Sequence, residues 1–226
     1  MNCVIQARMS SKRLPGKTLK KINNLPVLKI LLNNLKKSKK IKKIVVATSK
    51  NSEDKKIVKY CKINKINFYI GPLHNVFNRL LACAKYYKFK YFIRINGDSP
   101  FIDFKLIDKL IFIKSKKKNY DIYTNVFPRS FPKGQSIEII KTSSMEGLNY
   151  KLNKSQKEHV TKYFYENSKK FKIYNFNNLA NYSRFNLSID CKSDLRTFRQ
   201  IFKKYNLNKY YTYNKLIKLK LRYEKN

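Results

Sequence analysis

The stretch that decides the fold is "NCVIQARMSSKRLPGKT", residues 2–18. Residues 2–7 are a continuous, mostly apolar run, which predicts a buried strand. The stretch ends in Gly-Lys-Thr, as a phosphate-binding P-loop does. A P-loop also needs glycine at position 11, where this chain has Ser11, and a helix that begins at Lys17. Pro15 and the residues after Thr18 favour a loop instead, so the sequence argues against a P-loop.

What remains is a basic loop after the first strand, with Arg8, Arg13 and Lys17 beside two hydroxyls and a glycine. Fixed cations suit a triphosphate, whose negative charge must be neutralised before a nucleophile can approach. A loop at this place is also where nucleotides bind in doubly wound sheets. The alternative is a solvated loop without a ligand, in a chain that is basic throughout.

The first half of the chain alternates strands and helices. Further apolar runs at 43–48, 67–70 and 91–95 predict strands. Helices are predicted from Pro26 to about 37, from a Ser52 cap to 62, over 74–87, and from an Asp103 cap to about 113. Continuous apolar strands separated by helices predict an α/β fold with a doubly wound, mostly parallel Rossmann-like sheet. Ligands of such sheets bind at the carboxyl ends of the strands, here after Ala7, Thr48, Ile70 and Ile95.

The second half is less regular. Strands are predicted at 121–125, 136–140, 171–176 and 185–189, and helices at 142–150, 156–168 and from a Ser193 cap to about 205. The basic tail, about 207–226, has the spacing of a short amphipathic helix packed on the core. We expect one domain, 1–226, with a β-rich excursion at about 120–180.

Two aspartates follow predicted strands, in a chain with only 13 acidic residues. Asp98 comes after 91–95 and Asp190 after 185–189, so the two could share one Mg²⁺, which takes few protein carboxylates beside phosphate and water. The alternative for Asp98 is a turn residue that binds its own backbone. Asp194 is expected to serve the dipole of the last long helix.

Glu158 and His159 are adjacent and would point in different directions on a helix, which argues against a catalytic dyad. Substrate hydrogen bonding and a structural role both remain open for them. The four cysteines are isolated and lack zinc-ligand spacing, which favours a reducing compartment. The N-terminus does not have the pattern of a signal peptide, and no run of about 18 apolar residues predicts a membrane span. We therefore expect a cytoplasmic protein.

The formal net charge is +39, and 52 residues are lysine or arginine. Such a charge raises the hypothesis of a non-catalytic binder of nucleic acid or another polyanion. Arginine, which reads bases and phosphates in a bidentate manner, supplies only nine of the 52. The lysines are spread along the chain and accompany Asn, Ile, Tyr and Phe, which share A/T-rich codons. A solvated basic surface without a specific nucleic-acid partner is the favoured interpretation.

Five segments occur in an order that resembles a known family. They are "IQARMSSKRLPGKTL" (5–19), "IVVATS" (44–49), "RINGDSPFID" (94–103), "EHVTKYFY" (158–165) and "LSIDCKSDL" (187–195). Together they resemble the cytidylyltransferases of the CMP-sugar synthetase type, and especially the spore coat polysaccharide biosynthesis protein F branch. That branch is similar to the enzymes that activate 3-deoxy-manno-octulosonate and acylneuraminate.

The resemblance implies transfer of CMP from CTP to a sugar acid, with release of pyrophosphate and a requirement for Mg²⁺, in surface polysaccharide biosynthesis. It implies triphosphate binding by Arg8, Ser11, Arg13 and Lys17, and Mg²⁺ binding by Asp98 and Asp190. Among these residues, Arg8, Lys17 and Asp98 would be catalytic. Arg79 would lie near the nucleotide, and backbone groups around Ala7 and Thr48 would read the cytosine. The acceptor would be bound by Gln135, Glu138, Glu158 and His159, and the protein would be a homodimer.

Two positions depart from the family pattern. Ser10 stands where many relatives have glycine, which would stiffen the loop. Ser136 stands where the branch commonly has aspartate in "PxGxDxE", while Glu138 is kept. An altered acceptor or a lost activity would follow from the second departure. A sugar phosphate or polyol phosphate acceptor on the same fold is the alternative enzyme hypothesis.

Overall fold

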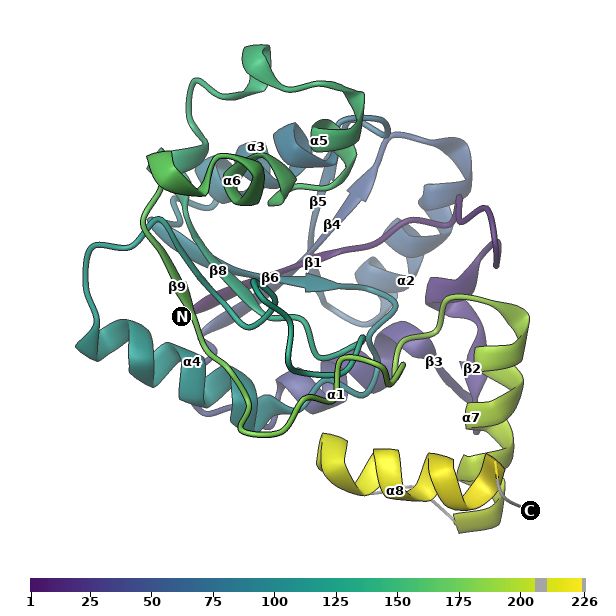
Figure 1. Cartoon of the computed structure of the whole chain (residues 1–226). Coiled ribbons are helices and arrows are strands. Elements are labelled where there is room, and N and C mark those ends of the chain that lie inside the picture. Colours follow the sequence, from purple (N-terminus) through teal and green to yellow (C-terminus); the bar gives the residue numbers. More distant parts are fainter. Residues whose placement is uncertain (206–210, 225–226) are drawn as a thin grey trace.

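The computed structural model describes residues 1–205 and 211–224. These residues form a central seven-stranded sheet with helices packed around it (Figure 1). In chain order the strands are β1 (Asn2–Gln6), β4 (Lys43–Ser49), β5 (Asn67–Gly71), β6 (Tyr91–Asn96), β7 (Ile122–Thr124), β8 (Glu138–Lys141) and β9 (Ile173–Asn175). Their order across the sheet is β5-β4-β1-β6-β8-β7-β9, and β8 runs antiparallel to both of its neighbours. The predicted α/β class with a mostly parallel sheet is confirmed.

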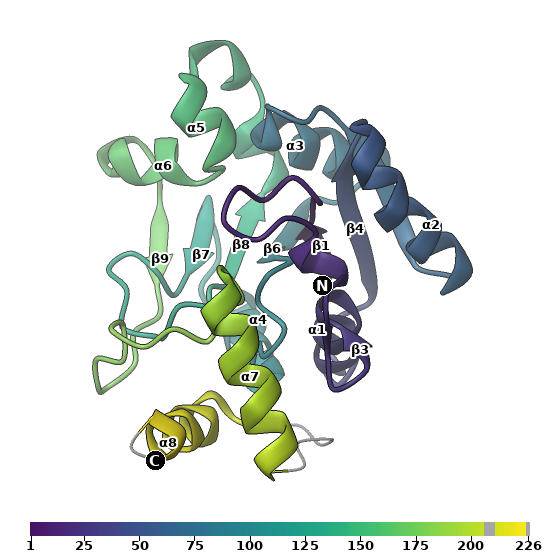
Figure 2. The same ribbon diagram turned by 90° about the vertical axis from the view of Figure 1, so that its right-hand side faces the viewer.

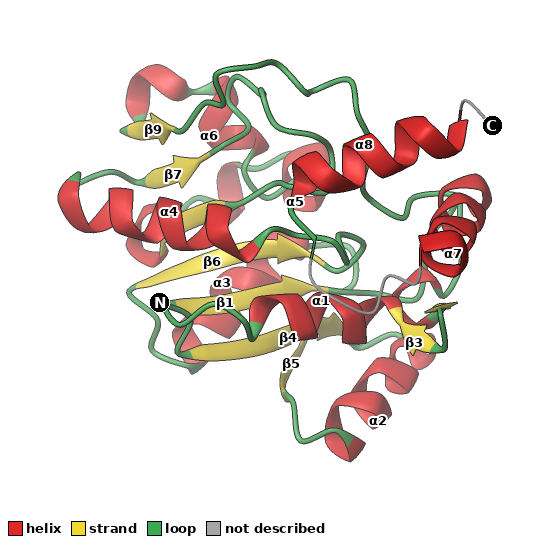
Figure 3. Cartoon of the chain, turned by 90° about the horizontal axis from the view of Figure 1, so that it is seen from below, coloured by secondary structure: helices red, strands yellow, loops and turns green. Residues whose placement is uncertain are grey.

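Helices cover both faces of this sheet, as Figure 3 shows for α1 and α4 in front of the strands and α3 behind them. One face carries α1 (Val27–Leu35), α2 (Lys55–Ile63), α4 (Phe104–Lys116), α7 (Lys192–Tyr205) and α8 (Tyr213–Glu224); the other carries α3 (Val76–Tyr86), α5 (Lys154–Glu158) and α6 (Lys162–Glu166). Along β1, Cys3 and Ile5 pack into the first core and Val4 into the second. Burial on both faces explains why the strand has no polar alternation.

The strand order changes direction at β1. From β1 the chain runs to β4 and β5 on one side and then returns to β6 on the other. The register aligns the strand ends, because Gln6 pairs with both Ala47 and Asn96. The loops that follow β1 and β6 therefore leave the sheet at a topological switch point, where doubly wound folds bind ligands. Figure 2 looks toward this edge, with the loop after β1 crossing in front of the strand ends.

Three elements of the second half differ from their predictions. The helix predicted at 142–150 is two 3₁₀ turns, η3 (Thr142–Met145) and η4 (Asn149–Lys151), separated at Gly147, whose φ of +71° is left-handed. The helix predicted at 156–168 is broken into α5 and α6 at His159, where ψ is 85°. The strand predicted at 185–189 is absent from the described residues, and only a single bridge joins Asn186 to Lys133 there.

Two helices begin differently from their predictions, which placed caps at Ser52 and Ser193. The side chain of Asn51, not Ser52, accepts the Glu53 amide at 2.9 Å, and a 3₁₀ turn, η2 (Ser52–Asp54), precedes α2. Ser193 lies inside α7, and it is the Asp194 carboxylate that accepts the amides before this helix. Asp103 does cap α4, because its side chain accepts the Lys105 amide at 2.9 Å. A short hairpin of β2 (Lys21–Ile22) and β3 (Leu25–Pro26) was not predicted.

Of the predicted tail at 207–226, residues 207–210 and 225–226 lie outside the described residues. The described part forms α8, which buries Tyr213, Leu216, Ile217 and Leu219 in the same core as α7. The prediction of an amphipathic helix packed on the core is confirmed for this part. None of the helices within 1–205 and 211–224 is both long and apolar enough to cross a membrane.

Gly134 fixes the path of the chain toward Asp190. Its φ is +87°, and a Cβ atom there would lie 2.6 Å from the carbonyl carbon of Leu187 and 2.7 Å from the nitrogen of Ser188. We expect Gly134→Ala to lower the free energy of unfolding by about 3 kcal/mol, because both the backbone angle and the contact are unfavourable. Urea unfolding measures this. Gly147→Ala is the matched control, since φ is +71° with nothing within 4 Å, and it should cost about 1 kcal/mol. Equal losses in the two variants would contradict the clash.

Candidate active site

The loop after β1 is held by hydrogen bonds at both ends. The Met9 amide donates to Asp54 Oδ1 at 2.6 Å, and the fully buried Asp54 also accepts from the amide and hydroxyl of Ser49 at the end of β4. The Met9 carbonyl in turn accepts the Gly16 amide at 2.8 Å. These backbone bonds hold the loop in place, and several of its side chains line the cavity described below.

Gly16 ends this loop in a left-handed conformation, with φ of +71°. It is followed by one 3₁₀ turn, η1 (Lys17–Leu19), and then by the hairpin of β2 and β3. A P-loop would instead continue into a helix whose first amides face the phosphates. The turn directs Lys17 across the ends of the strands. In place of the backbone amides of a P-loop, this loop therefore presents cationic side chains to the cavity.

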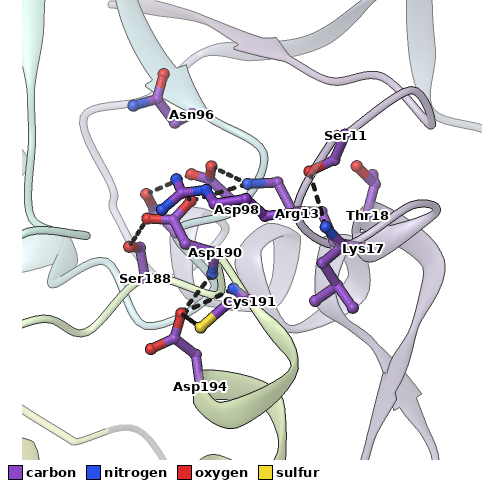
Figure 4. Close-up of polar contacts among 12 residues, drawn as sticks. Ser11, Arg13, Lys17, Thr18, Asn96, Asp98, Ser188, Asp190, Cys191 and Asp194 are labelled. Atoms are coloured by element: carbon purple, nitrogen blue, oxygen red, sulfur yellow. Dashed lines mark hydrogen bonds and ion pairs between the residues drawn. The ribbon is translucent and has the colours of Figure 1, made fainter.

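Lys17 lies between Asp98, which follows β6, and Asp190, which follows the segment 185–189 (Figure 4). Its Nζ atom is 2.6 Å from Asp98 Oδ2 and 3.0 Å from Asp190 Oδ1. Arg13 adds a longer contact to Asp190, 3.3 Å from its Nη2 atom to Oδ1. The two carboxylates thus converge on one cation, from segments 92 residues apart that the Ile189 amide joins by donating to the Asp98 carbonyl at 2.8 Å.

Asp190 is held in place by its neighbours. The Asp194 carboxylate accepts the Asp190 amide at 2.8 Å, and the Ser188 hydroxyl donates to Asp190 Oδ2 at 2.9 Å. Burial raises the pKa of the Asp190 carboxyl, but Lys17, Ser188 and Arg13 outweigh burial and lower that pKa below its ordinary value. Asp190 is therefore an anion near neutral pH. Asp194, predicted to serve the helix dipole, also fixes the backbone that carries Asp190.

These residues line a cavity of about 1100 Å³ at the switch point, hereafter the larger cavity. From the loop after β1 it includes Ala7, Arg8, Ser11, Arg13 and Lys17. From other elements it includes Arg79, Asp98, Glu158, His159 and Asp190. Residues from five separate segments of the chain thus line one cavity.

Arg8 and Arg79 lie on the side of the larger cavity near α3. Arg8 Nη2 is 2.6 Å from Glu158 Oε1, with both side chains about one-third exposed. Arg79 is almost fully buried, and its Nη1 donates to the carbonyl of Pro72 at 2.8 Å. Burial, followed by the charge of Arg8, lowers the pKa of Arg79 to about 10. Arg79 therefore holds the loop after β5 at the cavity wall.

Three predicted site residues lie elsewhere. Thr48 is fully buried and does not line the larger cavity. Gln135 is also fully buried; its amide nitrogen donates to the Phe101 carbonyl at 2.8 Å, and its oxygen accepts the Asp103 amide at 2.9 Å. These bonds tie the loop before β8 to the loop after β6, so Gln135 supports the fold at this place. Glu138 faces a second cavity.

The second cavity, hereafter the smaller cavity, has a volume of about 500 Å³ and shares Arg94, Asn96 and His159 with the larger one. Glu138, on β8, pairs there with Arg94 and accepts from the hydroxyls of Thr161, at 2.7 Å, and Tyr165, at 2.5 Å. Burial raises the pKa of Glu138, but Arg94 and these hydroxyls outweigh it, so the pKa lies below its ordinary value. Burial and the adjacent Glu138 charge raise the pKa of Tyr165 well above its ordinary value, so its hydroxyl stays protonated.

Sequence reasoning missed the part of the site that surrounds Glu138. Arg94 is the charged residue of a strand whose other central residues, Phe92, Ile93 and Ile95, are fully buried. A charge inside an apolar run was a usable signal, because such a charge requires a partner. Arg129, which also lines the smaller cavity, lies in an irregular loop where no periodic pattern marks it.

Comparison with known proteins places this geometry in a family. The profile of the cytidylyltransferase family matches residues 2–225. The structure of a cytidylyltransferase from Leptospira borgpetersenii serovar Hardjo-bovis superposes with a TM-score of 0.90 at 32% identity, covering 96% of this chain and 92% of that one. The spore coat polysaccharide biosynthesis protein SpsF of Bacillus subtilis is 25% identical over 209 residues, 89% of this chain and 85% of that protein.

A more distant structure shares the fold. CMP:2-keto-3-deoxy-manno-octonic acid synthetase, solved in complex with CTP, superposes with a TM-score of 0.68 at 14% identity, covering 90% of this chain and 99% of that one. The resemblance seen in the sequence motifs is thus confirmed over nearly the whole chain. With a mostly parallel sheet and a basic loop facing two aspartates at its switch point, this chain belongs to the cytidylyltransferase family.

Proposed function

We propose that this protein transfers CMP from CTP to a hydroxyl group of an acidic sugar, with Mg²⁺, and releases pyrophosphate. The observation that carries the proposal is the arrangement of Arg8, Arg13 and Lys17 opposite Asp98 and Asp190 in the larger cavity. Cations on one side suit a triphosphate, and carboxylates on the other suit a divalent metal ion. The role in surface polysaccharide biosynthesis is proposed from the likeness to SpsF.

The residues at the two strand ends fit Mg²⁺ by their chemistry. Asp98 and Asp190 present carboxylate oxygens 2.6 and 3.0 Å from the same cation, Lys17 Nζ, and both side chains are 23% exposed to the cavity. The residues that the structure describes contain no group of three or more His, Cys, Asp or Glu that could hold a metal. Asp98 and Asp190 would therefore hold the ion together with phosphate oxygens and water, where it would supply charge neutralisation for the triphosphate.

The reaction requires positioning and charge neutralisation from this chain. The acceptor oxygen forms a bond to the α-phosphorus while the bond from that phosphorus to the oxygen bridging to the β-phosphorus breaks, and the hydroxyl proton passes to solvent. Arg8, Arg13 and Lys17 would bind the triphosphate oxygens and stabilise the charge that develops on pyrophosphate. The smaller cavity adjoins the larger one at Arg94, Asn96 and His159, which would place the acceptor beside the nucleotide.

The first test is a thermal-shift assay with CTP, UTP, ATP and GTP, with and without Mg²⁺. A ligand that binds only the native state raises the unfolding temperature, and at equal concentration a tighter ligand raises it more, so CTP with Mg²⁺ should give the largest rise. Pyrophosphate release with CTP is then measured with sugar acids, sugar phosphates and polyol phosphates. Turnover of a phosphate but of no sugar acid would overturn the proposed acceptor. Indifference to every nucleotide would overturn the proposal as a whole.

A further inference from the structure

Arg129 lines the smaller cavity without an ionic partner. It is partly buried, its Nη2 donates to the Ser136 hydroxyl at 3.0 Å, and its Nη1 makes a long contact of 3.5 Å to the Pro132 carbonyl. The ion pairs found within 1–205 and 211–224 do not include it. Burial lowers the pKa of Arg129, with the charge of Glu138 acting the other way, which indicates that this guanidinium is poorly solvated. A poorly solvated guanidinium is stabilised by an anionic partner, because burying an unpaired charge costs free energy.

The other charges of the smaller cavity are already paired. Glu138 is bound by Arg94, and Glu166 lies 3.6 Å from the ammonium of Lys162. With these two pairs neutralised, Arg129 leaves the described lining with one uncompensated positive charge. The cavity therefore matches a ligand that brings one negative charge.

The loop that carries Arg129 is fixed from the edge of the sheet. Asn175, at the end of β9, accepts the Phe127 amide at 3.0 Å and donates to the Pro128 carbonyl at 3.0 Å. Farther along, the Ser130 hydroxyl accepts the Asn178 amide at 2.8 Å. Phe127 itself stacks on Tyr165, with ring centroids 4.6 Å apart and planes 9° apart. Arg129 is thus held at a defined place on the wall of the cavity, as a specificity residue must be.

We infer that Arg129 binds the carboxylate of the acceptor sugar and that the neutral Ser136 beside it keeps this arginine available. The inference rests on the proposed function and names the residue that selects an acid within it. A single unpaired arginine matches a monoanionic carboxylate, to which its two nitrogen donors can bond in parallel. A phosphate dianion would leave about one negative charge uncompensated in the same place.

Ser136 provides the sharpest test, because its hydroxyl already lies 3.0 Å from Arg129. Ser136→Asp places a carboxylate at the guanidinium and should raise KM for a sugar acid by about 10- to 100-fold, the effect of one charged hydrogen-bonding partner. Ser136→Asn has nearly the same size without the charge and is the matched control, with an expected change of less than about threefold. Both variants should keep the thermal shift given by CTP and Mg²⁺, which shows that they fold and bind nucleotide.

A second pair of variants measures selection directly. The acceptors are 2-keto-3-deoxy-manno-octonate, N-acetylneuraminate and the carboxamide of each, with pyrophosphate release from CTP as the readout. Arg129→Gln should reduce the preference of kcat/KM for acid over amide by about 10- to 100-fold, and Arg129→Lys should restore part of it. An undiminished preference in Arg129→Gln would overturn this inference and leave the proposed function standing. Failure of the unaltered protein to use any sugar acid would overturn both.

Discussion

Replacing Asp98 with asparagine is expected to lower the rate of pyrophosphate release by about 10³-fold and to leave the protein folded. Asparagine keeps the size of the side chain but removes one of the two carboxylates that converge on Lys17. The backbone bond from the Ile189 amide to the residue-98 carbonyl does not depend on the side chain, so the link between the two strand ends should persist. The loss should therefore fall on charge and metal binding.

Two measurements separate chemistry from folding in this variant. Pyrophosphate release under saturating CTP reports the rate, and the thermal shift reports binding. The shift given by CTP should lose its dependence on Mg²⁺, while the unfolding temperature without ligand should change by no more than a few degrees. Asp108→Asn is the control, because Asp108, on α4, accepts a hydrogen bond from the Ser38 hydroxyl and lies outside both cavities. Undiminished, Mg²⁺-dependent turnover in Asp98→Asn would contradict the proposal that Asp98 binds Mg²⁺.

The parallel half of the fold and the centre of the site could be predicted because both follow from strands. An apolar run with no alternation is buried on both faces, and the ends of parallel strands must meet at one edge. The aspartate after 91–95 could therefore be expected near the loop after 2–7. Asp190 reaches the same edge although its predicted strand does not form, because the Ile189 amide binds the Asp98 carbonyl.

The acceptor side could not be predicted in the same way, because tertiary contacts decide its local structure. The helix expected over 156–168 breaks at His159, and the Thr161 hydroxyl just beyond the break reaches the buried Glu138. The spacing of apolar residues in 156–168 does not predict the contact between Thr161 and Glu138. The magnesium requirement, the homodimer and the individual roles of the site residues stay predictions. So does the cytosine-reading role of the backbone at Ala7 and Thr48.

Glu138 was predicted to bind the acceptor, yet its contacts imply a large contribution to stability. It is 2% exposed, pairs with Arg94 and accepts two hydroxyl hydrogen bonds. Glu138→Gln removes the charge and leaves Arg94 with neutral partners, Gln6 Oε1 at 2.9 Å and Asn96 Oδ1 at 3.1 Å. Breaking a buried ion pair on one side costs about 3 kcal/mol of unfolding free energy. Urea unfolding at pH 7 measures the loss.

The pH dependence of the loss in unfolding free energy distinguishes a missing charge from a packing defect, because only the loss of a charge depends on pH. The pKa of Glu138 in the folded protein lies below its ordinary value of 4.5. Its contribution is therefore complete above the pKa of the unfolded chain and disappears as the pH falls through the lower folded value. The stability gap between the unaltered protein and Glu138→Gln should be widest at pH 7 and narrow as the pH falls below about 4.5. Glu146→Gln, which breaks the exposed pair with Lys85, should cost less than about 0.5 kcal/mol. A gap that stays constant from neutral to acid pH would show that Glu138 stabilises the protein through its shape and not through its charge.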